Sequence, residues 1–259
     1  MNFVNTELPD IIELRNINQT YNGNHVVLDN FNLLIEDKPD IGQFVTILGP
    51  SGCGKSTILK YVTGLEKPTS GDVLIHGQPL SKDTRVGMVF QQYSSFPWRT
   101  VLDNVAFGLE IAGVSKSERE ERAMSIIKIV GLEGHEKKFA KFGTLSGGQL
   151  QRVAIARSLL SNPEMLVMDE PFGALDVKTR LAMQSMLMNI WQTIHPTIIL
   201  VTHDISEAVF LSDDIYVMQA NPGKITNHIK PPFSYPRDFS IKKTREFSEM
   251  VDYVENLMM

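Results

Sequence analysis

The chain has 259 residues, of which 42% are hydrophobic, and its formal net charge at pH 7 is −5. This composition is typical of a globular protein that is long enough to bury a sizeable core. The acidic balance excludes the broad basic surface that holds nucleic acid, so no nucleic-acid partner is expected. A single cysteine, Cys53, excludes an intramolecular disulfide, and no run approaches the roughly 18 apolar residues of a membrane-spanning helix.

The strand signals come in two kinds. Short runs in the first forty residues alternate apolar and polar positions between Asn/Gly and Asp/Pro punctuation, which predicts an antiparallel β layer. From residue 44 onward, compact apolar runs alternate with helical patterns, which predicts buried strands of a parallel sheet in an α/β core. The predicted buried strands are residues 44–48, 86–90, 165–168 and 197–201.

Helical periodicity dominates two other regions. Between residues 100 and 161 no strand interrupts the helical spacing, so we expect an inserted helical lobe. After Asn221 the chain is rich in proline, and then an apolar stripe at helical spacing predicts a terminal amphipathic helix. The stripe consists of Phe247, Val251, Val254 and Met258.

Residues 49–56 carry the clearest chemical motif, G-x-x-x-x-G-K-S, placed between a strand-like run and a helix-like run. The pattern predicts a loop that binds a nucleoside triphosphate: glycines let backbone N–H groups surround the phosphates, Lys55 adds a positive charge, and Ser56 can ligate Mg²⁺. The N-terminus of the following helix favours the same anion. The candidate phosphate-binding residues are Gly49, Pro50, Ser51, Gly52, Cys53, Gly54, Lys55, Ser56 and Thr57.

An apolar run at residues 165–168 ends in two carboxylates, Asp169 and Glu170. Ligands bind at the carboxyl ends of strands in α/β sheets, so these side chains are placed for chemistry. Asp169 suits the Mg²⁺ shell, most simply through water, and Glu170 can accept a proton from an attacking water. The alternative is a solvated acidic turn.

Residues 145–149 read LSGGQ and precede a helical pattern. A serine and paired glycines before a helix predict an N-cap with backbone donors open to an anion. The second candidate anion site therefore consists of Ser146, Gly147, Gly148 and Gln149. Taken alone, the same residues would be only a helix cap.

Together these motifs resemble the ATP-binding cassette (ABC) family, in which LSGGQ is the signature sequence. The resemblance spans about residues 11–230 and implies roles for four further residues. Tyr21 would stack on adenine, Gln91 would contact Mg²⁺ and couple to membrane subunits, Asp176 would belong to the D-loop, and His203 would contact the γ-phosphate. Read singly, each would pass for a packing residue or an ordinary polar residue.

The resemblance also implies the architecture. It predicts an α/β P-loop NTPase cassette with a RecA-like mixed-sheet core, an antiparallel β subdomain and a helical subdomain inserted at about residues 95–160. The nucleotide-binding domain would then occupy residues 1–230, and residues 231–259 would form a C-terminal tail with the amphipathic helix. The chain departs from the usual family pattern at residues 36–43, where the turn is expected to be longer.

The family mechanism implies that one copy is not enough. ATP would lie between the phosphate loop of one copy and the signature residues of a second copy, or of a homologous cassette, arranged head to tail. Glu170 would polarise water, Lys55 and His203 would stabilise γ-phosphate charge, and Ser56, Gln91 and Asp169 would hold Mg²⁺. Because Cys53 lies in the loop, a maleimide is expected to block ATP hydrolysis, and Mg-ATP is expected to protect the thiol.

Residues 90–109 resemble importer cassettes for nitrate, sulfonate, taurine and bicarbonate, and so do residues 222–225 and 236–238. This implies integral membrane permease subunits as partners, a periplasmic or lipid-anchored solute-binding protein as an indirect partner, and a peripheral place on the cytoplasmic face of the membrane. Residues 1–7 lack a secretion signal, which agrees with a reducing compartment. The solute stays open. The apolar residues at 96–98 either form the groove for a permease helix, or Trp98 packs inside the helical lobe.

Three alternatives remain open at this point. The chain could be a cassette that works without a transporter, although such proteins usually carry paired cassettes or long insertions. It could belong to another transporter class, including an exporter on separate chains. It could also bind ATP without hydrolysing it, but it keeps Glu170, His203 and Ser146, which degenerate cassettes typically lose.

Overall fold

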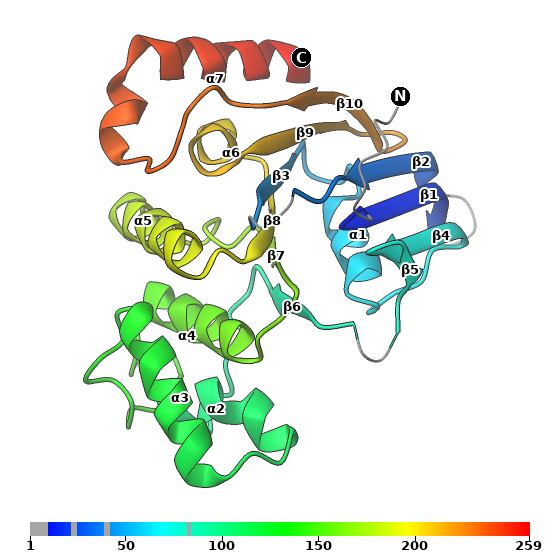
Figure 1. The fold of residues 1–259 in the computed structure, drawn as a ribbon. Coiled ribbons are helices and arrows are strands. Elements are labelled where there is room, and N and C mark those ends of the chain that lie inside the picture. The colour runs from blue at the N-terminus through cyan, green and yellow to red at the C-terminus, as the bar shows by residue number, and fades with distance from the viewer. Residues whose placement is uncertain (1–9, 22–24, 39–41, 82–83) are drawn as a thin grey trace. The chain divides into compact units, whose positions relative to one another are not determined.

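The computed structural model describes residues 10–21, 25–38, 42–81 and 84–259, and it divides into two compact units (Figure 1). The first unit combines residues up to Thr84 with residues from Thr197 onward. The second unit consists of residues 85–196.

The first unit contains an antiparallel sheet with strand order β2-β1-β4-β5. The antiparallel pairing of its first two strands agrees with the alternating pattern, whereas β4 and β5 lie beyond the predicted stretch. Apolar side chains of β1 point into the core, where Ile12, Leu14 and Ile17 are buried, while polar residues between them face outward. The strands are β1 (Ile12–Tyr21), β2 (His25–Ile35), β4 (Ser70–Ile75) and β5 (Gln78–Pro79).

A second group of strands in the first unit surrounds β3, whose residues are all buried. Strand β3 pairs in parallel with β8 on one side and with β9 on the other, and β10 pairs antiparallel with β9. A parallel strand buried on both faces reads as a continuous apolar run, which explains why β3 and β8 were predicted. The elements are β3 (Phe44–Leu48), α1 (Lys55–Val62), β8 (Thr197–Thr202), α6 (Ile205–Leu211), β9 (Asp214–Gln219) and β10 (Lys224–Ile229).

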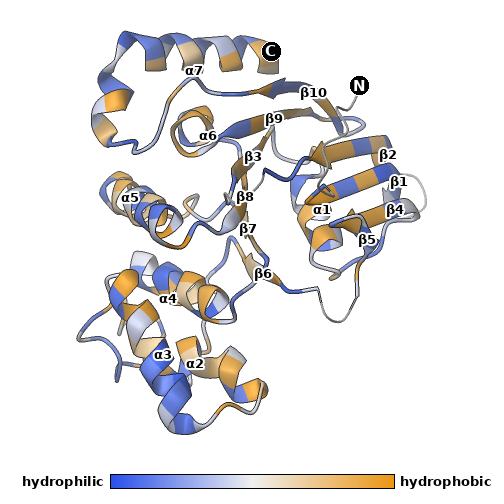
Figure 2. Cartoon of the chain, viewed as in Figure 1, coloured by the Kyte–Doolittle hydropathy of each residue, from blue (hydrophilic) through white to orange (hydrophobic). Residues whose placement is uncertain are grey.

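The C-terminal segment packs into the first unit through the short helix η1 (Phe239–Lys243) and helix α7 (Arg245–Met258). Helix α7 is amphipathic, as Figure 2 shows, and its buried residues Phe247 and Val254 belong to the predicted stripe. It lies against α6 and β9. The boundary at residue 230 stays a prediction, and the fold joins the residues on both sides of it in one unit.

Arg237 ties this segment to the end of α6. Its buried guanidinium donates to the carbonyl oxygens of Phe210 and Ser212 at 3.0 Å each, and the Tyr235 hydroxyl donates to Leu211 O at 2.8 Å. The last carbonyls of a helix have no partner within the helix. These side chains of the C-terminal segment supply the missing donors.

The second unit contains a parallel strand pair and the predicted helical lobe. Helices α2, α3 and α4 pack on one another, and α4 also contacts α5 and β6. Thr100, Ser115, Ser146 and Asp176 cap the helix N-termini by accepting a hydrogen bond from the N–H three residues on. The elements are β6 (Val86–Val89), α2 (Val101–Ile111), α3 (Lys116–Ile129), α4 (Gly147–Leu160), β7 (Met165–Asp169) and α5 (Val177–Ile194).

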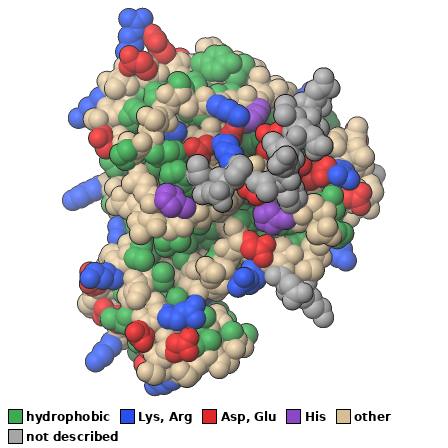
Figure 3. Space-filling model, viewed as in Figure 1, with side chains coloured by type: hydrophobic (Ala, Val, Ile, Leu, Met, Phe, Trp, Pro, Cys, Tyr) green, Lys and Arg blue, Asp and Glu red, His purple; other side chains and the backbone are tan. Residues whose placement is uncertain are grey.

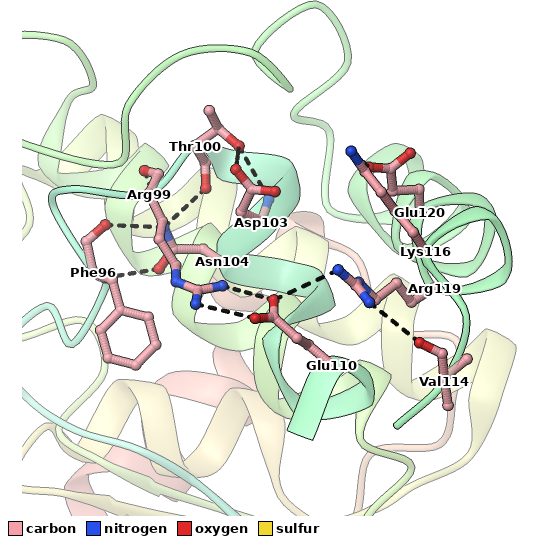
Figure 4. Close-up of polar contacts among 10 residues, drawn as sticks. All are labelled: Phe96, Arg99, Thr100, Asp103, Asn104, Glu110, Val114, Lys116, Arg119 and Glu120. Atoms are coloured by element: carbon pink, nitrogen blue, oxygen red, sulfur yellow. Dashed lines mark hydrogen bonds and ion pairs between the residues drawn. The ribbon is translucent and has the colours of Figure 1, made fainter. Parts of the chain in front are cut away.

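The fully buried Asn104 of α2 fixes the segment that leads into this helix (Figure 4). Its amide donates to the carbonyl oxygens of Phe96 and Thr100 at 3.0 and 2.9 Å, and its Oδ1 accepts from Phe96 N–H at 2.7 Å. Arg99 adds a two-point ion pair with Glu110 at 2.8 and 3.2 Å. These side-chain contacts hold the segment between β6 and α2 together with a backbone hydrogen bond from Ala140 N–H to Arg99 O at 3.0 Å.

Acidic and basic side chains are interspersed over the face of the described residues that Figure 3 shows. This distribution agrees with the net charge of −5. Within the described ranges, no helix is both long and apolar enough to cross a lipid bilayer.

Asp214, at the start of β9, is a buried carboxylate that contacts two partly exposed basic side chains in the first unit. Its carboxylate accepts hydrogen bonds from Lys38 Nζ at 2.6 Å and from His228 Nε2 at 2.7 Å, while only 6% of the side chain is exposed. Burial alone would raise its pKa, but the hydrogen bonds from His228 and Lys38 outweigh burial and hold the pKa at about 2.

We predict that Asp214 makes the stability of the protein sensitive to acid. A depressed carboxyl pKa stabilises the fold above the unfolded pKa of about 3.9 and loses that contribution as pH falls toward the folded value, about 2 to 3 kcal/mol in all. The difference in unfolding free energy between the wild type and Asp214→Asn, measured by urea denaturation, should shrink between pH 6 and pH 3. An equal difference at both pH values would contradict this account.

Candidate functional site

The phosphate loop joins β3 to α1 in the first unit, at the carboxyl end of the buried strand. Two of its glycines adopt left-handed backbone, Gly52 with φ of 81° and Gly54 with φ of 102°. Gly54 is also the N-cap residue of α1, and Ile58 N–H donates to its carbonyl at 3.0 Å. Only glycine adopts such φ values without strain, so the motif and the turn require each other.

At Gly49 and at Gly223, the packing around the loop leaves no room for a side chain. A Cβ at Gly49 would lie 2.5 Å from Met218 O of β9, and a Cβ at Gly223 would lie 2.2 Å from Cys53 O. Gly223 belongs to the segment whose resemblance to the anion importers was noted from the sequence. The structure shows that this glycine packs directly against the backbone of the phosphate loop at Cys53.

Lys55 lies almost fully buried at the first position of α1, with 5% of its surface exposed. Its Nζ donates to the carbonyl oxygens of Gly49 at 2.8 Å and Pro50 at 2.9 Å. The ammonium group is thereby held across the loop, beside the helix N-terminus whose N–H groups lack partners within the helix. This arrangement concentrates positive charge where the sequence predicts the phosphates.

Cys53 is a residue of the phosphate loop and is fully buried, and burial raises the pKa of its thiol. Lys55 Nζ lies 3.9 Å from its sulfur. The expectation that Mg-ATP would protect an otherwise reactive thiol is therefore wrong, because the fold itself already shields Cys53.

His203 follows β8 and is exposed. The preceding residue, Thr202, connects this position to the phosphate loop, because its carbonyl accepts from Gly49 N–H at 3.4 Å. Its hydroxyl donates to Glu207 Oε2 at 2.9 Å and accepts from Asp204 N–H at 3.0 Å. The structure thus brings His203 next to the start of the phosphate loop, and its contact with the γ-phosphate stays a prediction.

Tyr21 ends β1, and its hydroxyl donates to Glu66 Oε1 at 2.7 Å. Burial and this hydrogen bond raise the pKa of Tyr21, while a hydrogen bond with Thr57 lowers it. The contact with Thr57 places Tyr21 beside the first turn of α1. Stacking on adenine stays a prediction, and residues 22–24, which follow Tyr21, lie outside the described residues.

Glu170 is the first residue after β7 in the second unit, and its φ of 42° is left-handed. A non-glycine residue in this region carries strain, which occurs preferentially at functional sites. Gln91 Nε2 donates to Glu170 Oε2 at 3.1 Å. Gly173 lies against both, since its Cβ would be 3.7 Å from Glu170 Oε2 and 3.8 Å from Gln91 Nε2. The structure therefore brings these two predicted site residues together, next to the partly buried Asp169.

The signature residues form the predicted helix cap at the start of α4. Ser146 Oγ accepts from Gln149 N–H at 3.3 Å, and Gln149 Oε1 accepts from Ser146 N–H at 2.9 Å. This is a capping box, in which the two residues satisfy each other's backbone donors.

Two close contacts bring the signature glycines against other parts of the second unit. A Cβ at Gly147 would lie 2.4 Å from the Tyr93 hydroxyl, and a Cβ at Gly148 would lie 2.4 Å from Thr179 Cγ2. Thr179 also donates from its backbone N–H and hydroxyl to Asp176, at 3.1 and 2.6 Å. These hydrogen bonds lower the Asp176 pKa. The segment after Gln91, the signature and the start of α5 therefore converge at one place.

Sequence reasoning missed Tyr93 and Thr179 as neighbours of the signature. Tyr93 lies two residues after Gln91, and Thr179 lies three residues after the helix cap Asp176, so their positions offered a weak local signal. The contacts themselves follow only from the tertiary fold.

Trp98 does not pack inside the helical lobe, because 70% of its surface is exposed. Its ring lies against Phe96 with 5.5 Å between centroids, and the Arg157 guanidinium covers Phe96 at 4.9 Å. The alternative in which Trp98 is a core residue is therefore wrong. A large exposed aromatic is typical of a contact surface.

We predict that Gly148→Ala destabilises the second unit by about 1 to 3 kcal/mol, because the new methyl group collides with Thr179 Cγ2. Thr179→Ser removes that methyl group and keeps the hydroxyl that bonds Asp176. The double variant should recover most of the lost unfolding free energy in a denaturation experiment. Equal stability of Gly148→Ala and Gly148→Ala/Thr179→Ser would show that the contact is not responsible.

We further predict that the Cys53 thiol reacts slowly with a maleimide in the native protein, since it is buried and less of it is ionised. Unfolding in urea should make the reaction fast, and Mg-ATP should change the native rate little. Mass spectrometry of timed samples measures both rates. Native labelling as fast as that of a small-molecule thiol would contradict the burial of Cys53.

Comparison with known proteins agrees with this geometry. Residues 31–173 match the ABC transporter family. An uncharacterized ABC transporter ATP-binding protein of Methanocaldococcus jannaschii is 47% identical, over 92% of this chain and 86% of the relative. The nitrate import ATP-binding protein NrtD of Synechocystis is 40% identical over 95% and 94%. The taurine import ATP-binding protein TauB of Escherichia coli O157:H7 is 42% identical over 90% and 91%.

Solved structures show the same fold. The bacterial ABC transporter cassette MJ0796, solved as a dimer, is 36% identical with a TM-score of 0.72, over 86% of this chain and all of that chain. The same cassette has been solved in a post-hydrolysis state with ADP and phosphate. The chain therefore has the P-loop fold of an ABC cassette, with its antiparallel layer and its helices. It belongs to the ABC transporter family and is an ATP-binding ATPase of that family.

Proposed function

We propose that the chain is the ATP-hydrolysing subunit of an importer for a small anion or organic anion of the nitrate, sulfonate, taurine or bicarbonate type. The observation that carries this proposal is the identity of 40 to 42% with nitrate and taurine import ATP-binding proteins over at least 90% of either chain. Residues 90–109 and the glycine at 223 belong to the same resemblance. The solute itself is selected by other subunits.

The working unit that we propose is a head-to-tail dimer, formed with a second copy or with a homologous cassette. The phosphate loop lies in one unit of the chain and the signature cap in the other, so each copy carries two candidate anion sites. The dimeric cassette structure of a relative supports the proposal. Closure would bring the open backbone donors of Gly147 and Gly148 to the phosphate chain of ATP bound to the other copy.

The side-chain roles that we propose follow from the charge of each group and from its position relative to the expected phosphates. Lys55, at the mouth of the phosphate loop, and His203, beside it, would stabilise charge on the γ-phosphate. Glu170 would accept the proton of the attacking water. Gln91 holds the Glu170 carboxylate at 3.1 Å, so nucleotide binding would have to shift this amide before Glu170 can meet water.

A magnesium ion fits the residues that the sequence predicts for it, Ser56, Gln91 and Asp169. All three offer oxygen, which a hard cation prefers, and Mg²⁺ is usually bound by few protein groups together with substrate phosphates. In keeping with this, the described residues contain no cluster of three His, Cys, Asp or Glu side chains that could hold a metal by itself. When bound, the ion would neutralise charge on the phosphates.

Two further residues have proposed roles outside the metal site. Tyr21 would hold the adenine, and Asp176 would support the signature of its own chain through Thr179.

Partners follow from the same proposal. The chain would work at the cytoplasmic face of the membrane, bound peripherally to integral permease subunits, with a solute-binding protein acting on the far side. Trp98 and Phe96 offer a permease helix an exposed aromatic anchor. Residues 1–230 would form the nucleotide-binding domain, with a helical insertion at about 95–160 and a tail from 231.

We predict that Glu170→Gln binds ATP, dimerises and hydrolyses at least about 100-fold more slowly than the wild type, because the amide cannot accept the proton. Glu121→Gln, an exposed glutamate on α3, is the matched control and should keep the wild-type rate. Phosphate release and sedimentation in Mg-ATP measure the two properties. Hydrolysis by Glu170→Gln at the control rate would overturn the role of Glu170.

The importer proposal is tested separately by reconstitution. The chain, its co-purified permease and its binding protein in vesicles should take up labelled nitrate, taurine or another small anion when ATP is present on the cassette side. Stimulated ATP hydrolysis with export, or no permease in the purified complex, would contradict it.

A further inference from the structure

His135 contacts the signature from a loop that sequence reasoning did not single out. Its Nε2 lies 2.9 Å from Gln149 Nε2, and its Nδ1 lies 3.2 Å from the carbonyl oxygen of Glu133. Both His135 and Gln149 are half-buried. Gln149 is the residue that closes the capping box with Ser146.

The proton positions in this contact follow from its geometry. Gln149 Oε1 faces the Ser146 N–H, a donor, so the other end of the amide, at His135, must be its NH₂ group. That group donates, so His135 Nε2 accepts and carries no proton. His135 Nδ1 faces a carbonyl and therefore carries the proton. The neutral imidazole with hydrogen on Nδ1 satisfies every contact.

The loop that carries His135 is fixed to the start of α2. Leu102 N–H donates to Glu136 O at 3.0 Å, and Val101 N–H donates to Lys138 O at 2.8 Å. These are first-turn donors of α2, which lack partners within their own helix. Backbone hydrogen bonds thus hold the loop that carries the imidazole. Gln149 has several rotatable bonds and loses conformational entropy when its side chain is fixed in the cap, and the hydrogen bond to His135 offsets that loss.

We propose that His135 is a positioning residue for the signature: it locks the Gln149 side chain on the Ser146 N–H and so pre-orders the N-terminus of α4 that meets ATP. This inference rests on the proposed function, in which that N-terminus closes on nucleotide held by a second copy. His135 touches neither nucleotide nor water in this scheme. It acts only through Gln149.

Two replacements of His135 test separately the hydrogen-bond acceptor and the size of the ring. His135→Gln places an amide oxygen where Nε2 lies and keeps an acceptor for Gln149. His135→Phe keeps the size of the ring and removes the acceptor. Both are made in the full chain that also carries Glu170→Gln, so that Mg-ATP drives dimerisation without turnover. Dimerisation is followed by analytical ultracentrifugation, ATP binding by a fluorescent analogue, and folding by thermal melting.

His135→Phe should weaken Mg-ATP-driven dimerisation at least about 5-fold, because a dimer loses the hydrogen bond twice and each bond contributes modestly. ATP binding to the separate chains and the melting temperature should stay unchanged. His135→Gln should dimerise within about 2-fold of the parent. In a Gln149→Ala background, His135→Phe should have no further effect, because the contact is already absent.

The outcomes distinguish the positioning role of His135 from the proposed function on which that role rests. If Glu170→Gln with native His135 fails to dimerise in Mg-ATP, the proposed function is wrong. If that parent dimerises and His135→Phe equals it, or if His135→Gln is as weak as His135→Phe, the positioning role is wrong. An undiminished effect of His135→Phe in the Gln149→Ala background would also overturn it.

Discussion

Both candidate anion sites depend on main chain that approaches other atoms closely at its glycines, where an added Cβ would collide. Gly49 lets the phosphate loop pack against β9, and Gly223 lets the segment after β9 pack against the carbonyl of Cys53 in that loop. Gly147 and Gly148 bring the signature against Tyr93 and Thr179. A backbone N–H can point at a phosphate only where no side chain stands in the way. The packing around these glycines therefore fixes in advance the backbone donors of both candidate anion sites, and it does so separately in the two units of the chain.

The side chains that we propose for catalysis are already paired within the chain. Lys55 donates to carbonyl oxygens of its own loop, and Gln91 donates to the Glu170 carboxylate. Such contacts compensate the charged groups in the absence of nucleotide. In the proposed mechanism, nucleotide binding and closure of the dimer exchange these internal contacts for contacts with phosphate, which couples hydrolysis to assembly.

The sequence predicted the elements whose signals are local. The phosphate loop, the cap Ser146, the buried strands and the amphipathic α7 all follow from spacing and residue type within a few positions. What it missed or left open depends on contacts between segments: the burial of Cys53, the choice between an exposed and a packed Trp98, and the approach of Tyr93, Thr179 and His135 to the signature. The left-handed backbone of Glu170 was equally invisible, because glutamate gives no signal for positive φ.

The central claim is that one complete site requires the phosphate loop of one copy and the signature of another. It is tested most directly by mixing two differently tagged chains in the Glu170→Gln background, one with Lys55→Ala and one with Ser146→Arg. Neither variant should self-associate in Mg-ATP, but the mixture holds one intact composite site and should give a heterodimer that co-purifies through either tag. Failure of the mixture to associate, while the unmodified background dimerises normally, would contradict the claim.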